Sequence, residues 1–346
     1  MKVVFRVDAS LTMGTGHVMR CLTLAQVLKE NGINIEFICR KHKGNLIDKI
    51  CSSGFLTHEL ELADGSETDN TLAYSSWLGV TQQKDADECI DILKVEKIDW
   101  LIVDNYALDE QWQKRLKPYY KKIMVIDDLA NRRHQCDILL DQTYGRQHDD
   151  YVTLVPKYCE LLLGSQYALL RPEFSKLIKK ALEKRKNTQE IKNILISMGG
   201  TDIENITYDI LQNINNDYNT IVTLGQKSPH HKMLKNYAKN KNITVMIDAS
   251  NMAELMLNAD LAIGAGGSTS WERCCLGLPT LLYITADNQK TISENLERIG
   301  AVKIVKDLKK NLQSMSTDFS LWEAMSKNAT TISDGLGVNR VAKNLQ

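Results

Sequence analysis

Several short segments of this 346-residue chain combine glycine with side chains that could bind a ligand or move a proton. The first runs from Asp8 to Arg20 and reads DASLTMGTGHVMR, with Gly14 and Gly16 just before His17. Two glycines let a ligand approach the backbone closely, and the unpaired N–H groups at the start of a helix attract anions. Phosphate is the natural ligand for such a turn, although a plain tight turn would give the same pattern.

His17 is the residue of this turn that could do chemistry. In the first turn of a helix it would lie near positive backbone charge, which favours neutral imidazole at pH 7, the form that a general base needs. A histidine that only packs or caps within the turn is the alternative. The turn is not a dinucleotide motif, because Met19 stands where G-x-G-x-x-G requires glycine, and no P-loop motif occurs in the sequence.

A second glycine-rich turn lies at the head of the second half of the chain and reads Ser197-Met-Gly199-Gly200-Thr201-Asp202-Ile-Glu-Asn205. It follows an apolar run and precedes a helix-length segment, as the first turn does. Two helix N-termini that face one cleft would suit a ligand with two phosphates.

A third turn, residues 263–272, reads IGAGGSTSWE and includes Gly267 and Ser268. It combines a flexible backbone, hydroxyl side chains and a carboxylate one turn into a helix. Glu272 follows Thr269 by three residues, which is the spacing of a helix cap. Glu272 could also accept hydrogen bonds from a ribose diol, as acids do in nucleotide sites.

A pair of amide side chains follows the next apolar run. The segment YITADNQ, residues 283–289, ends a strand and begins a helix, with Asn288 and Gln289 at the mouth of that helix. Amides both donate and accept hydrogen bonds, so the two residues are candidates for contacts with a ligand.

Acidic residues end two expected strands of the first half. Asp104 leads into Asn105 and Tyr106, and Asp127 is followed by Asp128. If the sheet is parallel, these side chains lie on the same edge as the first glycine-rich turn. Paired carboxylates there could act as acid and base in glycoside chemistry, hold Mg²⁺, or only cap the loops that follow.

The elements that must position these residues are visible as β-rich apolar runs that alternate with amphipathic stretches of helix length. This alternation is typical of βαβ units, so the class is α/β with parallel sheets. The expected strands are 2–8, 35–39, 100–103, 122–126, 138–140, 193–197, 220–224, 243–247, 260–263, 280–284 and 302–305. The expected helices are 18–30, 46–52, 85–95, 205–213, 252–258, 270–275 and 291–299.

The pattern divides the chain into two similar halves, each of which begins with a strand, a glycine-rich turn and a helix. We expect an N-terminal domain over 1–170 and a C-terminal domain over 193–320. The Lys/Glu-rich, aromatic-poor segment 171–192 is the expected linker. Residues 321–346 have a helical pattern and could pack back on either half, with the N-terminal domain as the favoured one.

Composition excludes several classes of protein. Apolar residues make up 43% and charged residues 25%, as in an ordinary globular chain. Lys and Arg number 43 and so do Asp and Glu, which gives no general field to attract nucleic acid or anionic lipid. Arg6 and Asp8 interrupt the first apolar run and the chain has no apolar stretch of about 18 residues, so we expect a cytoplasmic protein. Its eight cysteines show no C-x-x-C pair or zinc spacing, and we expect them to be reduced.

Taken together, five segments resemble the family of nucleotide-sugar hydrolases of pseudaminic acid biosynthesis, enzymes that remove UDP from UDP-2,4-diacetamido-2,4,6-trideoxy-β-L-altropyranose. The resemblance covers nearly the full chain. It implies the GT-B fold, two Rossmann-like parallel-sheet domains with an interdomain cleft, related to the glycosyltransferase that makes lipid II. It also implies a role in flagellin and cell-surface glycosylation. The segments are GTGHVMRCL at 14–22, IDDLA at 126–130, CDILL at 136–140, LGSQYALLRPEF at 163–174 and MGGTD at 198–202.

The resemblance also assigns roles to individual residues. It places the catalytic base on His17 and a neighbouring cleft tyrosine on Tyr106. It implies that UDP binds mainly to the C-terminal half, with its pyrophosphate near the glycine-rich turns. The residues expected to contact the substrate are Gly14, Gly16, Arg20, Gly199, Gly200, Thr201, Asn205, Gly267, Ser268, Glu272, Asn288 and Gln289.

The expected reaction is water attack at the anomeric carbon with inversion, without a metal or other cofactor, because helix N-termini and backbone N–H groups could carry the charge of the leaving group. We expect a monomer whose partner is the small UDP-sugar, and neither nucleic acid nor membrane. A transferase with a UDP-sugar donor is the first alternative. A hydrolysing sugar 2-epimerase and a non-catalytic nucleotide-sugar-binding module are the others.

Overall fold

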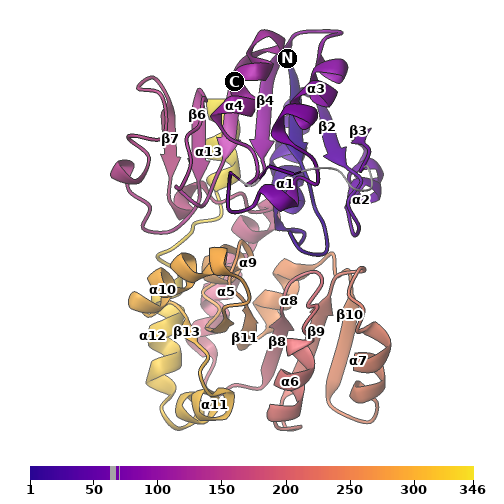
Figure 1. The fold of residues 1–346 in the computed structure, drawn as a ribbon. Coiled ribbons are helices and arrows are strands. Elements are labelled where there is room, and N and C mark those ends of the chain that lie inside the picture. Colours follow the sequence, from indigo (N-terminus) through magenta and orange to yellow (C-terminus); the bar gives the residue numbers. More distant parts are fainter. Residues whose placement is uncertain (63–67, 70) are drawn as a thin grey trace. The chain divides into compact units, whose positions relative to one another are not determined.

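The structure, a computed structural model, describes residues 1–62, 68–69 and 71–346 (Figure 1). The chain forms two compact units. The first comprises Met1–Leu169 and Val338–Gln346, and the second comprises Leu170–Gly337. Each unit holds one parallel sheet with helices packed on it, which confirms the predicted α/β class and the two Rossmann-like domains.

The first unit has a seven-stranded sheet of order β3-β2-β1-β4-β5-β6-β7. Alternate residues of β1 lie in two different apolar clusters: Val3 and Phe5 pack with α1, whereas Val4 packs with α3 and α4. The sheet is therefore covered on both faces, which is why its central strands, such as β4 and β5, are largely apolar. Its strands are β1 (Lys2–Val7), β2 (Asn34–Arg40), β3 (Leu56–Leu60), β4 (Ile98–Asp104), β5 (Tyr120–Ile126), β6 (Ile138–Asp141) and β7 (Glu160–Leu163). Its α-helices are α1 (Gly16–Glu30), α2 (Ile47–Ser52), α3 (Gln82–Leu93), α4 (Glu110–Leu116) and α13 (Gly337–Asn344).

The second unit has a six-stranded sheet of order β10-β9-β8-β11-β12-β13. Its core is formed by apolar residues of the central strands, such as Ile196 and Ile263, and of the flanking helices, such as Leu211. Its strands are β8 (Asn193–Ser197), β9 (Asn219–Leu224), β10 (Ile243–Ile247), β11 (Leu261–Ala265), β12 (Thr280–Tyr283) and β13 (Lys303–Ile304). Its α-helices are α5 (Pro172–Asn187), α6 (Ile206–Asn213), α7 (His231–Ala238), α8 (Met252–Asn258), α9 (Thr269–Cys275), α10 (Lys290–Arg298), α11 (Leu308–Thr317) and α12 (Phe319–Ala329).

Two segments differ from their expected form. The charged segment expected to be a linker contains α5, which packs on α8 and α9 of the second unit. Most of its charged side chains lie on the solvent side, whereas Phe174, Ala181 and the charged Arg185 are buried, so the composition that indicates a linker belongs to an amphipathic helix. The C-terminal stretch is divided between the units: α12 lies in the second, and Val338 and Val341 of α13 pack in the core of the first.

Candidate functional site

Strand order brings the first set of candidate residues together. In the first unit the chain leaves β1 toward β2 on one side of the sheet, and β4 lies against β1 on the other side. The loops that follow the carboxyl ends of β1 and β4 therefore run in opposite directions. Ligands of doubly wound sheets bind at the point where such loops separate. His17 follows β1, and Asp104 is the last residue of β4, so both lie at this point.

A short hydrogen bond joins the two residues. His17 Nδ1 lies 2.6 Å from Asp104 Oδ1, and both side chains are at least nine-tenths buried. Arg20, one helical turn after His17, donates from Nε to Asp104 Oδ2 at 2.6 Å and from Nη2 to Asp104 Oδ1 at 2.7 Å. The spacing of three residues puts His17 and Arg20 on the same face of α1, which explains why one carboxylate bonds both.

The charge on Asp104 fixes the tautomer of the imidazole. Burial opposes ionisation of this carboxyl group, but the charges of Arg20 and His17 outweigh burial and hold its pKa well below the ordinary range. An ionised carboxylate only accepts hydrogen bonds, so the 2.6 Å contact requires the proton on Nδ1 of His17. When the imidazole is neutral, this tautomer presents Nε2 as the atom that can take a proton, an arrangement that a catalytic base needs.

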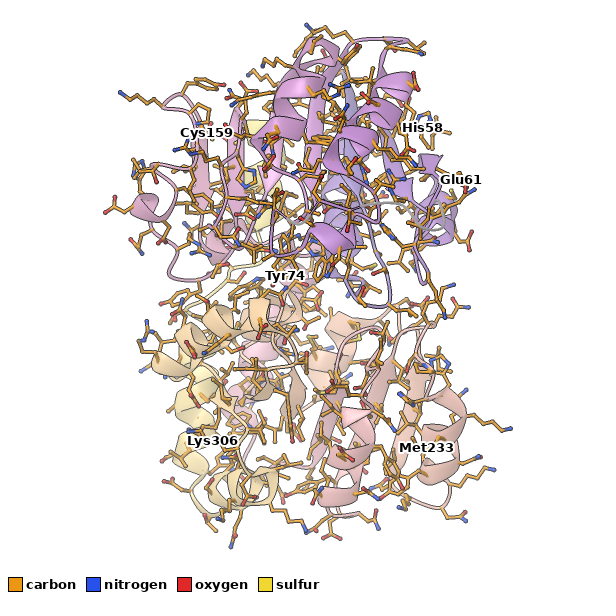
Figure 2. The ribbon with its side chains drawn as sticks, viewed as in Figure 1. His58, Glu61, Tyr74, Cys159, Met233 and Lys306 are labelled. Carbon is orange, nitrogen blue, oxygen red and sulfur yellow. The ribbon has the colours of Figure 1, made fainter. Side chains whose placement is uncertain are left out.

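Aromatic rings surround this histidine. The ring of Tyr106 meets the imidazole edge to face at a centroid distance of 4.6 Å, and Trp77 meets it at 6.2 Å. Trp77 in turn stacks on Tyr106 at 5.8 Å, and Tyr74, which is labelled in Figure 2, contacts both. With these rings around it, the His17 side chain is only 9% exposed.

Tyr106 also belongs to the polar network of the site. Its hydroxyl group donates to Asp128 Oδ2 at 2.8 Å, and Arg20 Nη1 donates to the same oxygen at 2.5 Å. Burial and the charge of Asp128 raise the pKa of Tyr106 well above its usual value, so Tyr106 remains a neutral hydroxyl. The other oxygen of Asp128 is buried and has no hydrogen-bond partner among the residues that the structure describes.

The three acids that could have formed a metal site each pair with arginine. Asp104 and Asp128 share Arg20, and Asp127 pairs with Arg132 at 2.7 Å. A carboxylate held by a guanidinium has fewer lone pairs for a cation. Within the described ranges, the structure has no group of three His, Cys, Asp or Glu side chains placed to hold a metal ion.

The second glycine-rich turn follows β8, and its backbone conformation requires glycine at position 199. Gly199 has a φ of +93°, and a Cβ built there meets no atom within 4 Å in the part of the chain that the structure describes, so the turn has an open face. Asp202 caps α6, because its two oxygens accept from the N–H groups of Ile206 and Thr207 at 3.0 Å. Asn205 immediately precedes α6 in the left-handed conformation and makes no side-chain cap. The carboxylate of Asp202 thus occupies N–H groups at the start of α6 that the sequence analysis expects to bind phosphate. Gly199, Gly200 and Thr201 remain at the carboxyl edge of the sheet.

The third turn follows β11, the strand next to β8, so both turns lie where the order of the second sheet reverses. A Cβ built at Gly267 meets no atom of the described residues within 4 Å, which leaves this turn open as well. Ser268 precedes α9 and makes no side-chain cap. Glu272 forms an ion pair with Arg171, with 3.7 Å between Nη2 and Oε1. Burial raises the pKa of Glu272, and the charges of Arg171 and Arg273 oppose that rise.

The amide pair lies beside this third turn. Gln289 accepts from the backbone N–H of Thr285 at 3.0 Å, which fixes the loop after β12. A Cβ at Gly266 would come within 3.2 Å of Gln289, so the two residues are in contact. Asn288, next to Gln289, is only partly buried. The parallel sheet of the second unit therefore places every expected UDP contact of this half at its carboxyl edge.

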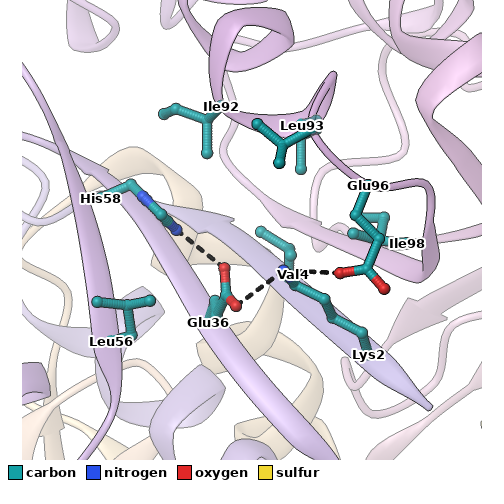
Figure 3. A pocket seen from close by; sticks show the side chains of 10 residues that line it. Lys2, Val4, Glu36, Leu56, His58, Ile92, Leu93, Glu96 and Ile98 are labelled. Atoms are coloured by element: carbon teal, nitrogen blue, oxygen red, sulfur yellow. Dashed lines mark hydrogen bonds and ion pairs between the residues drawn. The ribbon is translucent and has the colours of Figure 1, made fainter.

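A separate cavity of about 200 Å³ lies elsewhere in the first unit (Figure 3). Its lining residues come from the amino ends of strands, among them Lys2 of β1 and His58 of β3. Glu36 bonds both of these side chains at 2.9 Å across the cavity. The cavity is thus at the edge of the sheet opposite His17, and it contributes nothing to the candidate site.

Sequence reasoning missed several residues of these sites. Trp77 and Tyr74 lie in a short segment with no recognisable motif, and only their aromatic character could have drawn attention. Arg171 was noted only as part of a family segment, and its ion pair with Glu272 spans about a hundred positions of sequence. Arg273, next to Glu272, was also missed; it is buried under the third turn.

Comparisons with known proteins agree with this architecture. The family model for the glycosyltransferase family 28 C-terminal domain matches residues 163–334. The crystal structure of MurG from Acinetobacter baumannii superposes with a TM-score of 0.66 over 100% of this chain and 99% of that one, at 15% identity. This likeness confirms the predicted GT-B fold. In the described part of the chain, no helix is both long and apolar enough to cross a membrane.

Two relatives are similar in sequence over most of the chain. An uncharacterised protein of Methanocaldococcus jannaschii is 29% identical over 87% of this chain, which spans 59% of that longer protein. The UDP-2,4-diacetamido-2,4,6-trideoxy-β-L-altropyranose hydrolase of Campylobacter jejuni is 31% identical over 87% of this chain and 97% of its own length. With this identity and nearly complete mutual coverage, the chain belongs to the family of UDP-2,4-diacetamido-2,4,6-trideoxy-β-L-altropyranose hydrolases.

Proposed function

We propose that this protein hydrolyses UDP-2,4-diacetamido-2,4,6-trideoxy-β-L-altropyranose to UDP and the free sugar. The observation that carries the proposal is the 2.6 Å bond between His17 Nδ1 and Asp104 Oδ1, which leaves Nε2 as a base. Membership in the hydrolase family supports the choice of substrate. We further propose that the enzyme acts as a monomer in the cytoplasm, on a small-molecule substrate and without nucleic acid.

The proposed reaction is a single displacement. Nε2 of His17 takes a proton from a water molecule as the water oxygen bonds to the anomeric carbon. The bond from that carbon to the phosphate oxygen breaks at the same time, and UDP leaves with the electron pair. Because water attacks opposite the leaving group, the configuration at the anomeric carbon inverts. Asp104 stabilises the imidazolium that forms, as an acid partner of a catalytic histidine does.

The remaining site residues bind and orient the substrate in this proposal. Tyr106 and Arg20 hold the acid network around the base, and the turn of Gly14 and Gly16 borders it. UDP binds to the second unit, with its diphosphate at Gly199, Gly200 and Thr201 and at Gly267 and Ser268. Glu272 takes the ribose hydroxyls, and the polar contacts are completed by Asn205, Asn288 and Gln289.

No metal takes part in the proposed reaction. Backbone N–H groups of the glycine-rich turns would stabilise the negative charge on the leaving diphosphate. The pairing of Asp104, Asp127 and Asp128 with arginine supports this step, because those carboxylates already have cationic partners.

A proton NMR time course tests the proposal directly. The protein is incubated with the UDP-sugar in EDTA, without an added acceptor. We expect UDP and free sugar to appear together, with the inverted anomer first. Retention of configuration would rule out the single displacement. Loss of turnover in EDTA that Mg²⁺ restores would contradict the metal-free step. Tight UDP binding with no turnover would favour a transferase or another sugar.

A further inference from the structure

A buried cation without an acidic partner lies beneath the third glycine-rich turn. Arg273 of α9 is 1% exposed, and among the described residues it forms no ion pair. Its Nη2 atom donates to the carbonyl oxygen of Ala265 at 2.8 Å and to Ser270 Oγ at 3.0 Å. Its Nε and Nη1 atoms are buried and have no hydrogen-bond partner in the described part of the chain.

The other buried arginines of the molecule are compensated differently. In the first unit, Arg6, Arg20 and Arg40 each bond at least one buried carboxylate. In the second unit, Arg185 donates to the carbonyl groups of Met256 and Ala259 at the end of α8, where the helix dipole is negative. A buried cation costs free energy unless it is paired, and the charge of the neighbouring Glu272 raises the pKa of Arg273 by less than burial lowers it, so Arg273 requires an explanation.

The position of the guanidinium group identifies that counter-charge. A Cβ built on Gly264 would lie 2.4 Å from Nη1 of Arg273 and 2.8 Å from the carbonyl oxygen of Ser197. The guanidinium group is therefore against the end of β11, next to the end of β8, where the strand order of the second sheet reverses. Both glycine-rich turns begin at these strand ends. Glycine at position 264 is required because any side chain would occupy the place of the guanidinium group.

We propose that Arg273 is the buried counter-charge for the diphosphate of the bound nucleotide, and that it acts from beneath the turn without touching the ligand. The inference rests on the proposed function, because it assumes that UDP binds at these turns. Arg273 is a positioning residue: its charge attracts the diphosphate, and through Ser270 it holds the turn, since Gly267 N–H lies 3.4 Å from Ser270 Oγ. Burial lowers the pKa of Arg273 only to about 10, so it is charged at pH 7.

This role predicts an effect that depends on the charge of the ligand. In Arg273→Met, an apolar side chain of similar length replaces the cation. Affinity for UDP should fall about 10- to 100-fold, as expected for charges several ångström apart at the effective dielectric of a protein surface. Affinity for uridine should change less than threefold. Calorimetric titration with UDP and with uridine gives the ratio of the two affinities. Thermal unfolding should show that the ligand-free variant is at least as stable as the wild type.

Three further variants complete the test. Arg273→Gln removes the charge but keeps hydrogen-bonding capacity, and it replaces Arg273→Met in the test if the methionine variant does not fold. We expect the same selective loss of affinity for UDP. Arg273→Lys keeps the charge and should retain UDP affinity within about fivefold. Arg185→Met removes a buried guanidinium group elsewhere in the same unit, and its ratio of UDP to uridine affinity should equal that of the wild type.

The outcomes separate this inference from the proposed function. Equal losses of UDP and uridine affinity in Arg273→Met and Arg273→Gln would make Arg273 merely structural and overturn the inference. Unchanged UDP affinity in these variants would also overturn it. A wild-type protein that binds UDP but does not hydrolyse the UDP-sugar would contradict the proposed function alone, because the charge effect on UDP binding does not depend on turnover.

Discussion

His17 Nδ1 and Asp104 Oδ1 lie 2.6 Å apart, although 87 positions of sequence separate the two residues. The contact joins the helix after β1 to the end of β4, the two neighbouring strands at which the order of the first sheet reverses. It determines which nitrogen of the imidazole is free, and the predictions about catalysis depend on it.

Replacement of His17 by alanine should remove the base. We expect kcat to fall by about 10²–10⁴, the usual contribution of a positioned base, with affinity for UDP unchanged. Steady-state kinetics and calorimetry check the two parts. His148→Ala, at a histidine whose side chain is 70% exposed, is the control and should keep full activity. A loss below tenfold in His17→Ala would exclude the role of base.

Asp104→Asn should lower kcat by about 10²–10⁴ as well, because a neutral amide does not stabilise the imidazolium. KM should stay within a few-fold of the wild-type value, and the fall should persist across the pH profile. Cys21→Ala is a matched control, since Cys21 Sγ also lies 3.5 Å from Asp104 but has no proposed role. If Asp104→Asn turned over like the control, His17 would not depend on this carboxylate.

Two substitutions of Tyr106 separate its hydroxyl group from its ring. Tyr106→Phe removes the 2.8 Å bond to Asp128 and should lower kcat about 10-fold, the cost of one buried hydrogen bond that loses a partner. Tyr106→Ala also removes the ring against His17 and should lower kcat further. Steady-state kinetics of both variants separate the two contributions. A fully active Tyr106→Phe would show that only the ring of Tyr106 contributes to the site.

Glu272→Ala should weaken UDP binding about 10-fold or more, because a carboxylate that accepts from ribose hydroxyls would be lost. Calorimetry with UDP measures the effect. Glu173→Ala is the matched control, since Glu173 pairs with Arg171 at 3.1 Å as Glu272 does, but belongs to α5. Equal affinities in the two variants would leave Glu272 with a structural role only.

Asp141 should make stability depend on pH. Tyr151 Oη lies 2.8 Å from an oxygen of Asp127 and 2.8 Å from an oxygen of Asp141, but it has one hydrogen and can donate to only one of them. Burial and the charges of Asp128 and Asp127 raise the pKa of Asp141 to about 7 against the opposing charge of Arg146, so Asp141 is the carboxyl group that holds a proton below that pH.

The folded protein therefore holds one proton more than the unfolded chain between about pH 4 and pH 7. The free energy of unfolding should fall as pH rises through this window, by at most about 1.4 kcal/mol per pH unit. Asp104 and Asp127, whose pKa values are lowered, act below pH 4 and in the opposite direction. Urea unfolding across pH should show the fall in the wild type and in the control Asp149→Asn, but not in Asp141→Asn. The same slope in all three proteins would assign the fall to another group.

The sequence by itself determined the class of fold and the edge of each sheet at which the candidates lie. Continuous apolar runs such as Ile123–Ile126 indicate parallel strands covered on both faces, and residues that follow parallel strands must share an edge. That is why His17, Asp104 and Asp128 could be placed together without coordinates. Short or mixed elements escaped prediction: β3, β7, α4, α7 and α11 were missed, and α5 was expected to be a linker. Their patterns are weak because they lie at sheet edges or are amphipathic with a charged face.

Only the tertiary structure decided which groups are partners. It paired His17 with Asp104, gave the first amides of α6 to Asp202 and left Arg273 without a hydrogen-bonded carboxylate among the residues that the structure describes. Strand order, which sets these contacts, depends on how distant apolar faces pack together. Burial, which sets the state of charge, depends on the same packing. The sequence pattern shows the type and spacing of residues, whereas hydrogen-bond partners and burial are properties of the packed chain.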